Sequence, residues 1–120
     1  MTLKLKRSDK YKGFIRSQSN QNHQGNNGKN TLHFAVEHNR YDLVESILKK
    51  GIAVDSKDDF GNTALWRAVM DNVDIRIIKE LLDYHANPDI KNNFGISARD
   101  LLNDENKNWR ILKQLFDEIN

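Results

Sequence analysis

Aliphatic residues recur along this chain at intervals of 34 residues, and this spacing restricts the possible folds most strongly. Four parallel series keep their apolar character: Leu43, Ile77 and Ile111; Val44, Ile78 and Leu112; Ile47, Leu81 and Leu115; and Leu48, Leu82 and Phe116. Three glycines, Gly28, Gly61 and Gly95, follow at intervals of 33 and 34 residues. A period of this length is typical of stacked units, each of which packs only on its neighbours. The sequence therefore predicts one helical unit used three times.

Each predicted unit contains a short inner helix, an outer helix and a polar turn. Apolar residues at helical spacing place the helices at residues 30–38, 41–50, 64–70, 75–84, 97–102 and 109–119. Asn30, Thr63 and Asp74 are expected to cap three of these helices with a side-chain oxygen. The extra residue of the second unit falls between Val69 and Ile77, so we expect a longer turn there.

The glycine-led segments resemble the ankyrin-repeat family, whose motif is Gly-x-Thr-Pro-Leu-His-x-Ala. Residues 28–35 are GKNTLHFA and residues 61–68 are GNTALWRA, whereas residues 95–102, GISARDLL, match more loosely. The family's proline is missing from all three segments, and Trp66 replaces its histidine.

The resemblance implies an all-α ankyrin-repeat solenoid of about three helix-turn-helix units with β-turn fingers. Its predicted domain covers residues 25–120, with units at about 25–57, 58–91 and 92–120. Residues 1–24 are expected to form a basic, polar N-terminal arm or cap outside the repeats.

Composition adds limits to this prediction. At 120 residues the chain is expected to form one domain, and the absence of cysteine excludes disulfides and thiolate metal sites. With no long apolar run, the sequence predicts a cytoplasmic protein without a membrane span. The net charge of +2 is uneven, because residues 1–27 carry six basic and one acidic side chain while the remainder carries 13 basic and 16 acidic ones.

The N-terminal arm has three possible roles. Apolar residues in it are expected to cover the open end of the first unit, because a terminal repeat must be capped; they are Leu3, Leu5, Tyr11, Phe14 and Ile15. Its basic residues favour nucleic acid or an acidic surface as the alternative partner. A solvated charged terminus is the simplest reading.

The sequence gives no sign of catalysis. It contains no phosphate-binding glycine loop, nucleophile elbow or paired metal-binding histidines. Asp55, Asp58 and Asp59 share one loop but lack the ligand spacing of a calcium site. By resemblance, His33 is a structural hydrogen-bonding residue, and Trp66 is expected to pack between finger and helix. We therefore predict that the chain is not an enzyme and takes no cofactor or metal.

Ankyrin stacks carry partners on a concave side formed by fingertips and inner helices, and this position is transferred residue by residue. The expected partner-binding residues are Glu37, His38, Asp59, Phe60, Asn62, Met70, Asp71, Asn93, Phe94, Ile96 and Asp104. Aromatic and methionine side chains are enriched at interfaces, and acids steer a basic partner. Two simpler readings stay open: Phe60 and Phe94 pack against each other, or Asp59 and Asp71 are only solvated.

The predicted function is therefore binding of another protein. Small ankyrin-like chains resemble bacterial immunity proteins that neutralise a toxin, so a basic toxin domain is the more specific expected partner. Nucleic-acid binding through the basic arm is the alternative, and a monomer is the default oligomeric state.

Overall fold

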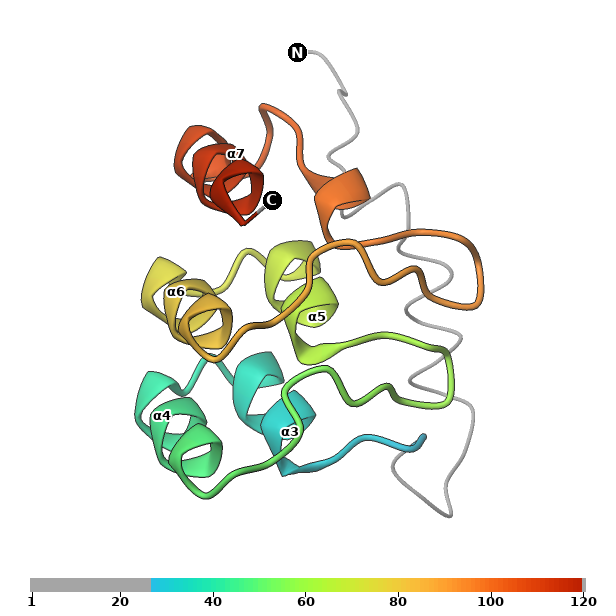
Figure 1. The fold of residues 1–120 in the computed structure, drawn as a ribbon, viewed down its shortest axis with the longest axis vertical. Helices are drawn as coiled ribbons and strands as arrows, with labels where there is room; N and C mark the ends of the chain where they lie inside the picture. Colours follow the sequence, from blue (N-terminus) through green and yellow to red (C-terminus); the bar gives the residue numbers. More distant parts are fainter. Residues whose placement is uncertain (1–26, 120) are drawn as a thin grey trace, which may run out of the picture.

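The computed structural model describes residues 27–119, which form a stack of helix pairs joined by projecting loops (Figure 1). The first pair is α3 (Thr31–Glu37) with α4 (Tyr41–Lys49), and the second is α5 (Ala64–Met70) with α6 (Ile75–Asp83). A 3-10 turn, η1 (Arg99–Leu101), and α7 (Trp109–Glu118) close the stack. The described residues contain no β-strand, so the all-α solenoid of helix pairs predicted from the sequence is confirmed.

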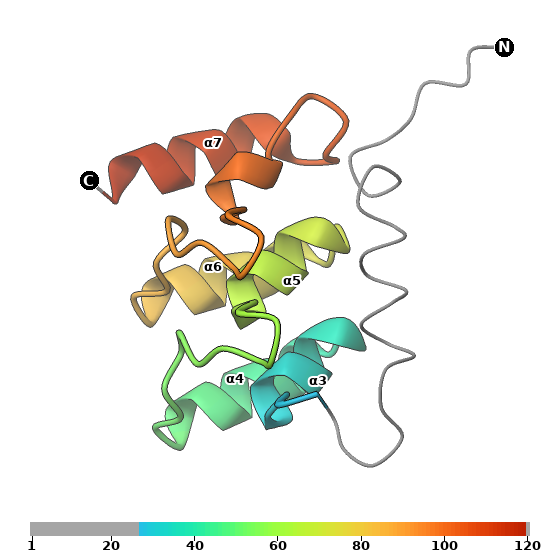
Figure 2. The same cartoon turned by 90° about the vertical axis from the view of Figure 1, so that its right-hand side faces the viewer.

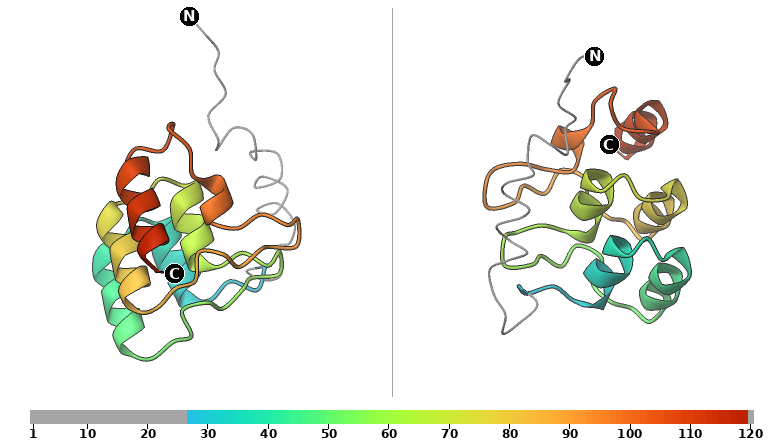
Figure 3. Two further views of the ribbon diagram at one scale, coloured as in Figure 1. Left: turned by 45° about the horizontal axis from the view of Figure 1, so that its top comes forward. Right: turned by 180° about the vertical axis from the view of Figure 1, so that it is seen from behind.

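The pairs lie in successive layers (Figure 2), with the outer helices α4, α6 and α7 on one side and the inner helices α3 and α5 beside them (Figure 1). Helix α3 packs on α5, and α4 packs on α6. The loops between pairs leave from the inner side, and the view from behind shows them as parallel fingers (Figure 3). The stack therefore has a finger side and an outer-helix side.

Side-chain caps start three of the helices, as predicted. The Asn30 side chain accepts a hydrogen bond from the His33 amide, and the His33 ring accepts one from the Asn30 amide, which completes a capping box. The Thr63 hydroxyl caps α5 by accepting from the Trp66 amide at 3.1 Å. The Asp74 carboxylate caps α6 by accepting from the Arg76 amide at 2.9 Å. Each cap satisfies an amide that has no partner within its own helix.

The turn inside the second pair is longer than that inside the first, which confirms the prediction. Residues 38–40 join α3 to α4, whereas residues 71–74 join α5 to α6. Both turns place an asparagine in the left-handed region, with φ of 56° at Asn39 and 52° at Asn72. The two turns are linked, because the Asn39 side chain accepts from the Asp74 amide at 2.8 Å.

The core runs through the middle of the stack. The repeat-equivalent residues Leu48 and Phe116 are 2% and 0% exposed, and Leu82 packs against the same core. Complete burial of such a side chain contributes about 1.5–3 kcal/mol. The periodic series therefore occupy related positions, and most of their members are buried.

One periodic series, that of Leu43, Ile77 and Ile111, is not buried throughout. Ile77 is 0% exposed, but Leu43 is 41% and Ile111 is 46% exposed. Ile77 lies in the middle pair, which has a neighbour on each side, whereas no described residue covers the end of the first pair at Leu43. Helix α7 follows only a 3-10 turn, and it directs Leu112 and Phe116 inward while leaving Ile111 outside.

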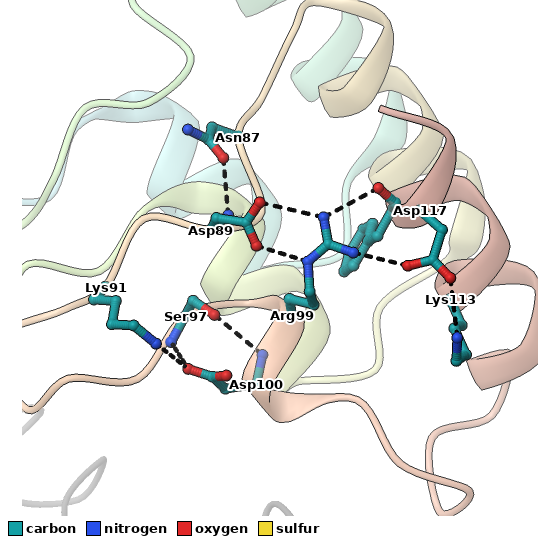
Figure 4. Close-up of polar contacts among 9 residues, drawn as sticks. Asn87, Asp89, Lys91, Ser97, Arg99, Asp100, Lys113 and Asp117 are labelled. Atoms are coloured by element: carbon teal, nitrogen blue, oxygen red, sulfur yellow. Dashed lines mark hydrogen bonds and ion pairs between the residues drawn. The ribbon is translucent and has the colours of Figure 1, made fainter. Parts of the chain in front are cut away.

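The third inner helix is also shorter than predicted. The sequence predicted a helix over residues 97–102, but the structure has the single 3-10 turn η1. The Asp100 carboxylate accepts from the Ser97 amide, and the Ser97 hydroxyl accepts from the Asp100 amide (Figure 4). These two bonds have the reciprocal pattern of a capping box, which starts a helical turn, and the turn ends early because the backbone at Leu102 is extended, with ψ of 133°.

Candidate protein-binding face

The fingers of the second and third units are built from the same turn. The Asp58 carboxylate accepts from the amides of Phe60 and Asn62, both at 2.9 Å. One repeat later, the Asn92 side chain accepts from the amides of Phe94 and Ile96 at 2.9 and 3.0 Å. Buried Asp58 therefore holds the backbone of the finger in its turn.

Neighbouring fingers are hydrogen-bonded to each other. The Asp59 amide donates to the Asn27 carbonyl at 2.8 Å, and the Asn93 amide donates to the Phe60 carbonyl at 3.0 Å. The Asn93 side chain adds a bond to the Asp59 carbonyl at 3.0 Å. The fingers thus form one connected array.

Glycine is required where the fingers approach each other. Gly61 has φ of 80°, and a Cβ atom there would lie 2.8 Å from the Asn93 amide nitrogen. Gly28 has φ of 76°, with a Cβ atom 2.8 Å from the Asp59 amide nitrogen. At both positions a side chain is disfavoured for two reasons, because φ is positive and because a Cβ atom would clash with the neighbouring backbone.

Nine of the eleven residues predicted for partner binding reach the surface. His38, Asp59, Asp71, Asn93, Phe94 and Asp104 are exposed, and Glu37, Phe60 and Ile96 are partly exposed. We call these nine residues the fingertip face. Phe94 is 59% exposed, the largest exposed fraction among the exposed large apolar side chains of the described chain.

The other two predicted residues are corrected by the structure. Asn62 is 0% exposed, and its carbonyl lies 3.0 Å from the Nε2 atom of His33 while its side-chain oxygen accepts from Asn92 at 2.9 Å. Met70 is 4% exposed on α5, the inner helix between α3 and η1. Both residues therefore support the fingertip face from inside and are not part of it.

A group of charges on the inner helices was missed by the sequence reasoning. The Glu37 carboxylate lies 2.7 Å from Lys29 Nζ and 3.3 Å from Arg67 Nε. Arg67 also lies 3.8 Å from Asp71, and its side chain is only 6% exposed. The signal available in the sequence was a lone arginine inside the apolar run 64–70.

This charge group changes the electrostatics of the fingertip face. The Asp71 side chain is 35% exposed, and partial desolvation of its carboxyl raises its pKa above the usual value, while Arg67 opposes that shift. The acids Glu37 and Asp71 are thus partly neutralised by Lys29 and Arg67. Exposed Asp59 and Asp104 therefore contribute more to the negative charge of the fingertip face than Glu37 and Asp71 do.

His33 has a structural role, as expected. Its ring is 2% exposed, and Nε2 lies 3.0 Å from the Asn62 carbonyl while Nδ1 lies 3.1 Å from the Asn30 amide. A neutral ring protonated on Nε2 satisfies both contacts. Trp66, which takes the equivalent place in the next unit, is buried at 1% exposure.

Searches of residues 27–119 for other kinds of site gave negative results. Within that range no three histidine, aspartate or glutamate side chains come together as metal ligands would. None of the helices described there has the length and apolarity to cross a membrane. The predicted roles of Leu3, Leu5, Tyr11, Phe14 and Ile15, and of the basic arm as a whole, lie outside the described residues.

Comparison with known protein families gives a match over most of the chain. A model described as ankyrin repeats (3 copies) matches residues 6–98. No curated protein matches the chain. The match covers more than half of the sequence, and the helix pairs and fingers agree with it. The chain therefore belongs to the ankyrin-repeat family.

Proposed function

We propose that the chain binds a partner protein through its fingertip face. Ankyrin repeats are general protein–protein interaction modules and a non-enzymatic family. The observation that supports this proposal most is Phe94, a large apolar side chain that is 59% exposed on a hydrogen-bonded finger. Exposed aromatic side chains on an ordered surface are typical binding anchors.

The hydrogen bonds between fingers support the proposal energetically. Association costs free energy wherever a loop must become ordered. Here the Asn93 amide and side chain already hold the third finger to the second. A partner that meets Phe94 therefore meets a backbone that needs little further ordering.

The charges of the fingertip face favour a basic partner. Asp59 and Asp104 are exposed, and acids at the rim of an interface accelerate association with a basic surface. The more specific form of the proposal is an immunity protein that neutralises a basic toxin domain. It depends on these two acids, since Glu37 already has Lys29 and Arg67 as cationic partners.

Site-specific photocrosslinking in the source cells tests the proposal. A photoreactive phenylalanine analogue at position 94 should give a discrete adduct with one protein. The same analogue at Lys79, an exposed position on outer helix α6, serves as the control and should give none. An adduct from position 79 and none from position 94 would reject the fingertip face as the binding site.

The alternative function is binding of nucleic acid or an acidic surface through the basic arm. Its basis is the sequence, since residues 1–27 carry six basic side chains and one acidic one. A gel-shift titration at rising salt tests it, because binding through phosphates weakens steeply with salt. Binding that persists after removal of residues 1–20 would exclude the arm.

Cytoplasmic location stays a prediction from the sequence, and cell fractionation tests it.

A further inference from the structure

The outer end of the first helix pair carries an apolar groove of about 530 Å³ between α3 and α4. Its walls come from both helices; they are Thr31, Phe34, Ala35, His38, Arg40, Leu43 and Ile47. Phe34 is 38% and Leu43 is 41% exposed there. We call this surface the end groove. The α3–α4 pair that carries it forms the end of the stack opposite α7 (Figure 1).

The equivalent surface of the second pair is covered. The residues one repeat after Phe34, Ala35, Leu43 and Ile47 are Arg67, Ala68, Ile77 and Leu81. These four are 5%, 0%, 0% and 0% exposed, because the first pair packs over them. Arg67 reaches back to Glu37 of the first pair. The end groove is therefore the surface on which a preceding unit sits.

The sequence before residue 27 repeats the outer-helix pattern in the same register. Tyr11, Phe14 and Ile15 stand 33 residues before Val44, Ile47 and Leu48. In α4 these three positions are buried or packed against the core. Three of the four core positions of an outer helix are thus apolar in residues 8–16, and the fourth, equivalent to the exposed Leu43, is Lys10.

The same register also fixes the connecting length. Between the end of α4 and the start of α5 lie residues 50–63. A helix over residues 8–16 leaves residues 17–30 before α3, a segment of the same length. The family match also begins at residue 6, inside the segment that the sequence analysis assigned to a non-repeat arm.

We propose that residues 8–26 form a further half unit, an outer helix at 8–16 followed by a finger, and that this helix occupies the end groove. Tyr11, Phe14 and Ile15 face the first pair and cover Leu43. The helix contains Gly13, which lowers its intrinsic stability, so it depends on the contact. The end groove shares His38 alone with the fingertip face, and this proposal does not rest on the proposed function.

Hydrogen exchange of the full chain, followed by mass spectrometry, tests the proposal. Amides 11–16 should exchange at least about tenfold more slowly than in an unfolded peptide. Leu43→Asp should abolish that protection. Ile111→Asp is the matched control, because Ile111 is 46% exposed at the equivalent position of the last unit. It should leave amides 11–16 protected.

A second variant distinguishes loss of the proposed contact from loss of folding. Phe14→Asp should remove protection from amides 11–16 while α5 and α6 stay protected. Unprotected amides 11–16 in the unchanged protein would overturn the proposal, as would equal effects of Leu43→Asp and Ile111→Asp. A dimer that Leu43→Asp dissociates, with amides 11–16 unprotected, would assign the end groove to a second copy.

Discussion

The Nε2 atom of His33 lies 3.0 Å from the carbonyl oxygen of Asn62, and this contact joins the first inner helix to the finger of the next unit. Asn62 is 0% exposed, and its carbonyl also accepts from the Asp58 amide at 3.0 Å, so the contact ties His33 to the fingertip turn. The same Asn62 side chain accepts from Asn92 of the following finger. The contact therefore belongs to a buried polar chain that runs across the units.

Stability should depend on the protonation of His33. Burial lowers the pKa of His33 below its usual value of 6.5, so the unfolded chain takes up the proton first. The contribution of the neutral ring is complete above pH 6.5 and is lost as pH falls toward the lowered pKa. His33→Ala should cost about 1–3 kcal/mol at pH 7.5 in urea unfolding, and less at pH 5. A cost that does not change with pH would contradict this role.

Gly51 and His85 stand at equivalent helix ends. The substitutions Gly51→His and His85→Gly should change the free energy of unfolding in opposite directions. Both adopt a left-handed backbone, with φ of 91° and 70°. Only glycine adopts it without strain. His85→Gly should raise the free energy of unfolding by up to about 1 kcal/mol, whereas Gly51→His should lower it by about 1–2 kcal/mol. Thermal unfolding measures both, and two changes of the same sign would be inconsistent with this explanation.

Arg99 connects the last finger to the closing helix. Its guanidinium donates to the Phe116 carbonyl at 3.1 Å and contacts the carboxylates of Asp89 and Asp117 (Figure 4). Arg99→Met should cost about 1 kcal/mol from the lost bond to the carbonyl alone. Lys113→Ala, which removes only an exposed ion pair with Asp117, is the control and should change little. The free energy of unfolding in urea measures both variants. Equal losses for Arg99→Met and Lys113→Ala would attribute the effect to surface charge.

Ile77 and Ile111 occupy the same sequence position in consecutive units but should contribute differently to the free energy of unfolding. Ile77 is 0% exposed and Ile111 is 46% exposed. Ile77→Ala should cost about 2–5 kcal/mol through lost burial and a cavity, and Ile111→Ala less than about 1 kcal/mol. Chemical denaturation of both variants compares them directly. Similar costs would mean that α7 packs like α6.

The repeat spacing was sufficient to predict the helix pairs because it records contacts between neighbouring units. The caps at Asn30, Thr63 and Asp74 were predictable from local chemistry, as was the longer turn before α6. Burial was less predictable, since it depends on what lies above and below each helix. Leu43 has the same sequence character as Ile77 and yet is exposed.

The candidate face was predicted only in part for a related reason. Asn62 was assigned to the surface by its position after the fingertip, but the next finger covers it through Asn92. Arg67 was passed over because a charged residue in a helix is usually solvated. Its burial between Glu37 and Asp71 depends on two different units, which local sequence does not reveal.

The affinity of the protein crosslinked through position 94 tests the central claim most directly. Its dissociation constant should be measured for the unchanged chain, for Phe94→Ala and for Ile111→Ala. Both replaced side chains are exposed and apolar, at 59% and 46%, but only Phe94 lies on the fingertip face. Phe94→Ala should weaken binding by about tenfold or more, and Ile111→Ala by less than about twofold. Unchanged affinity for Phe94→Ala with a large loss for Ile111→Ala would contradict the account.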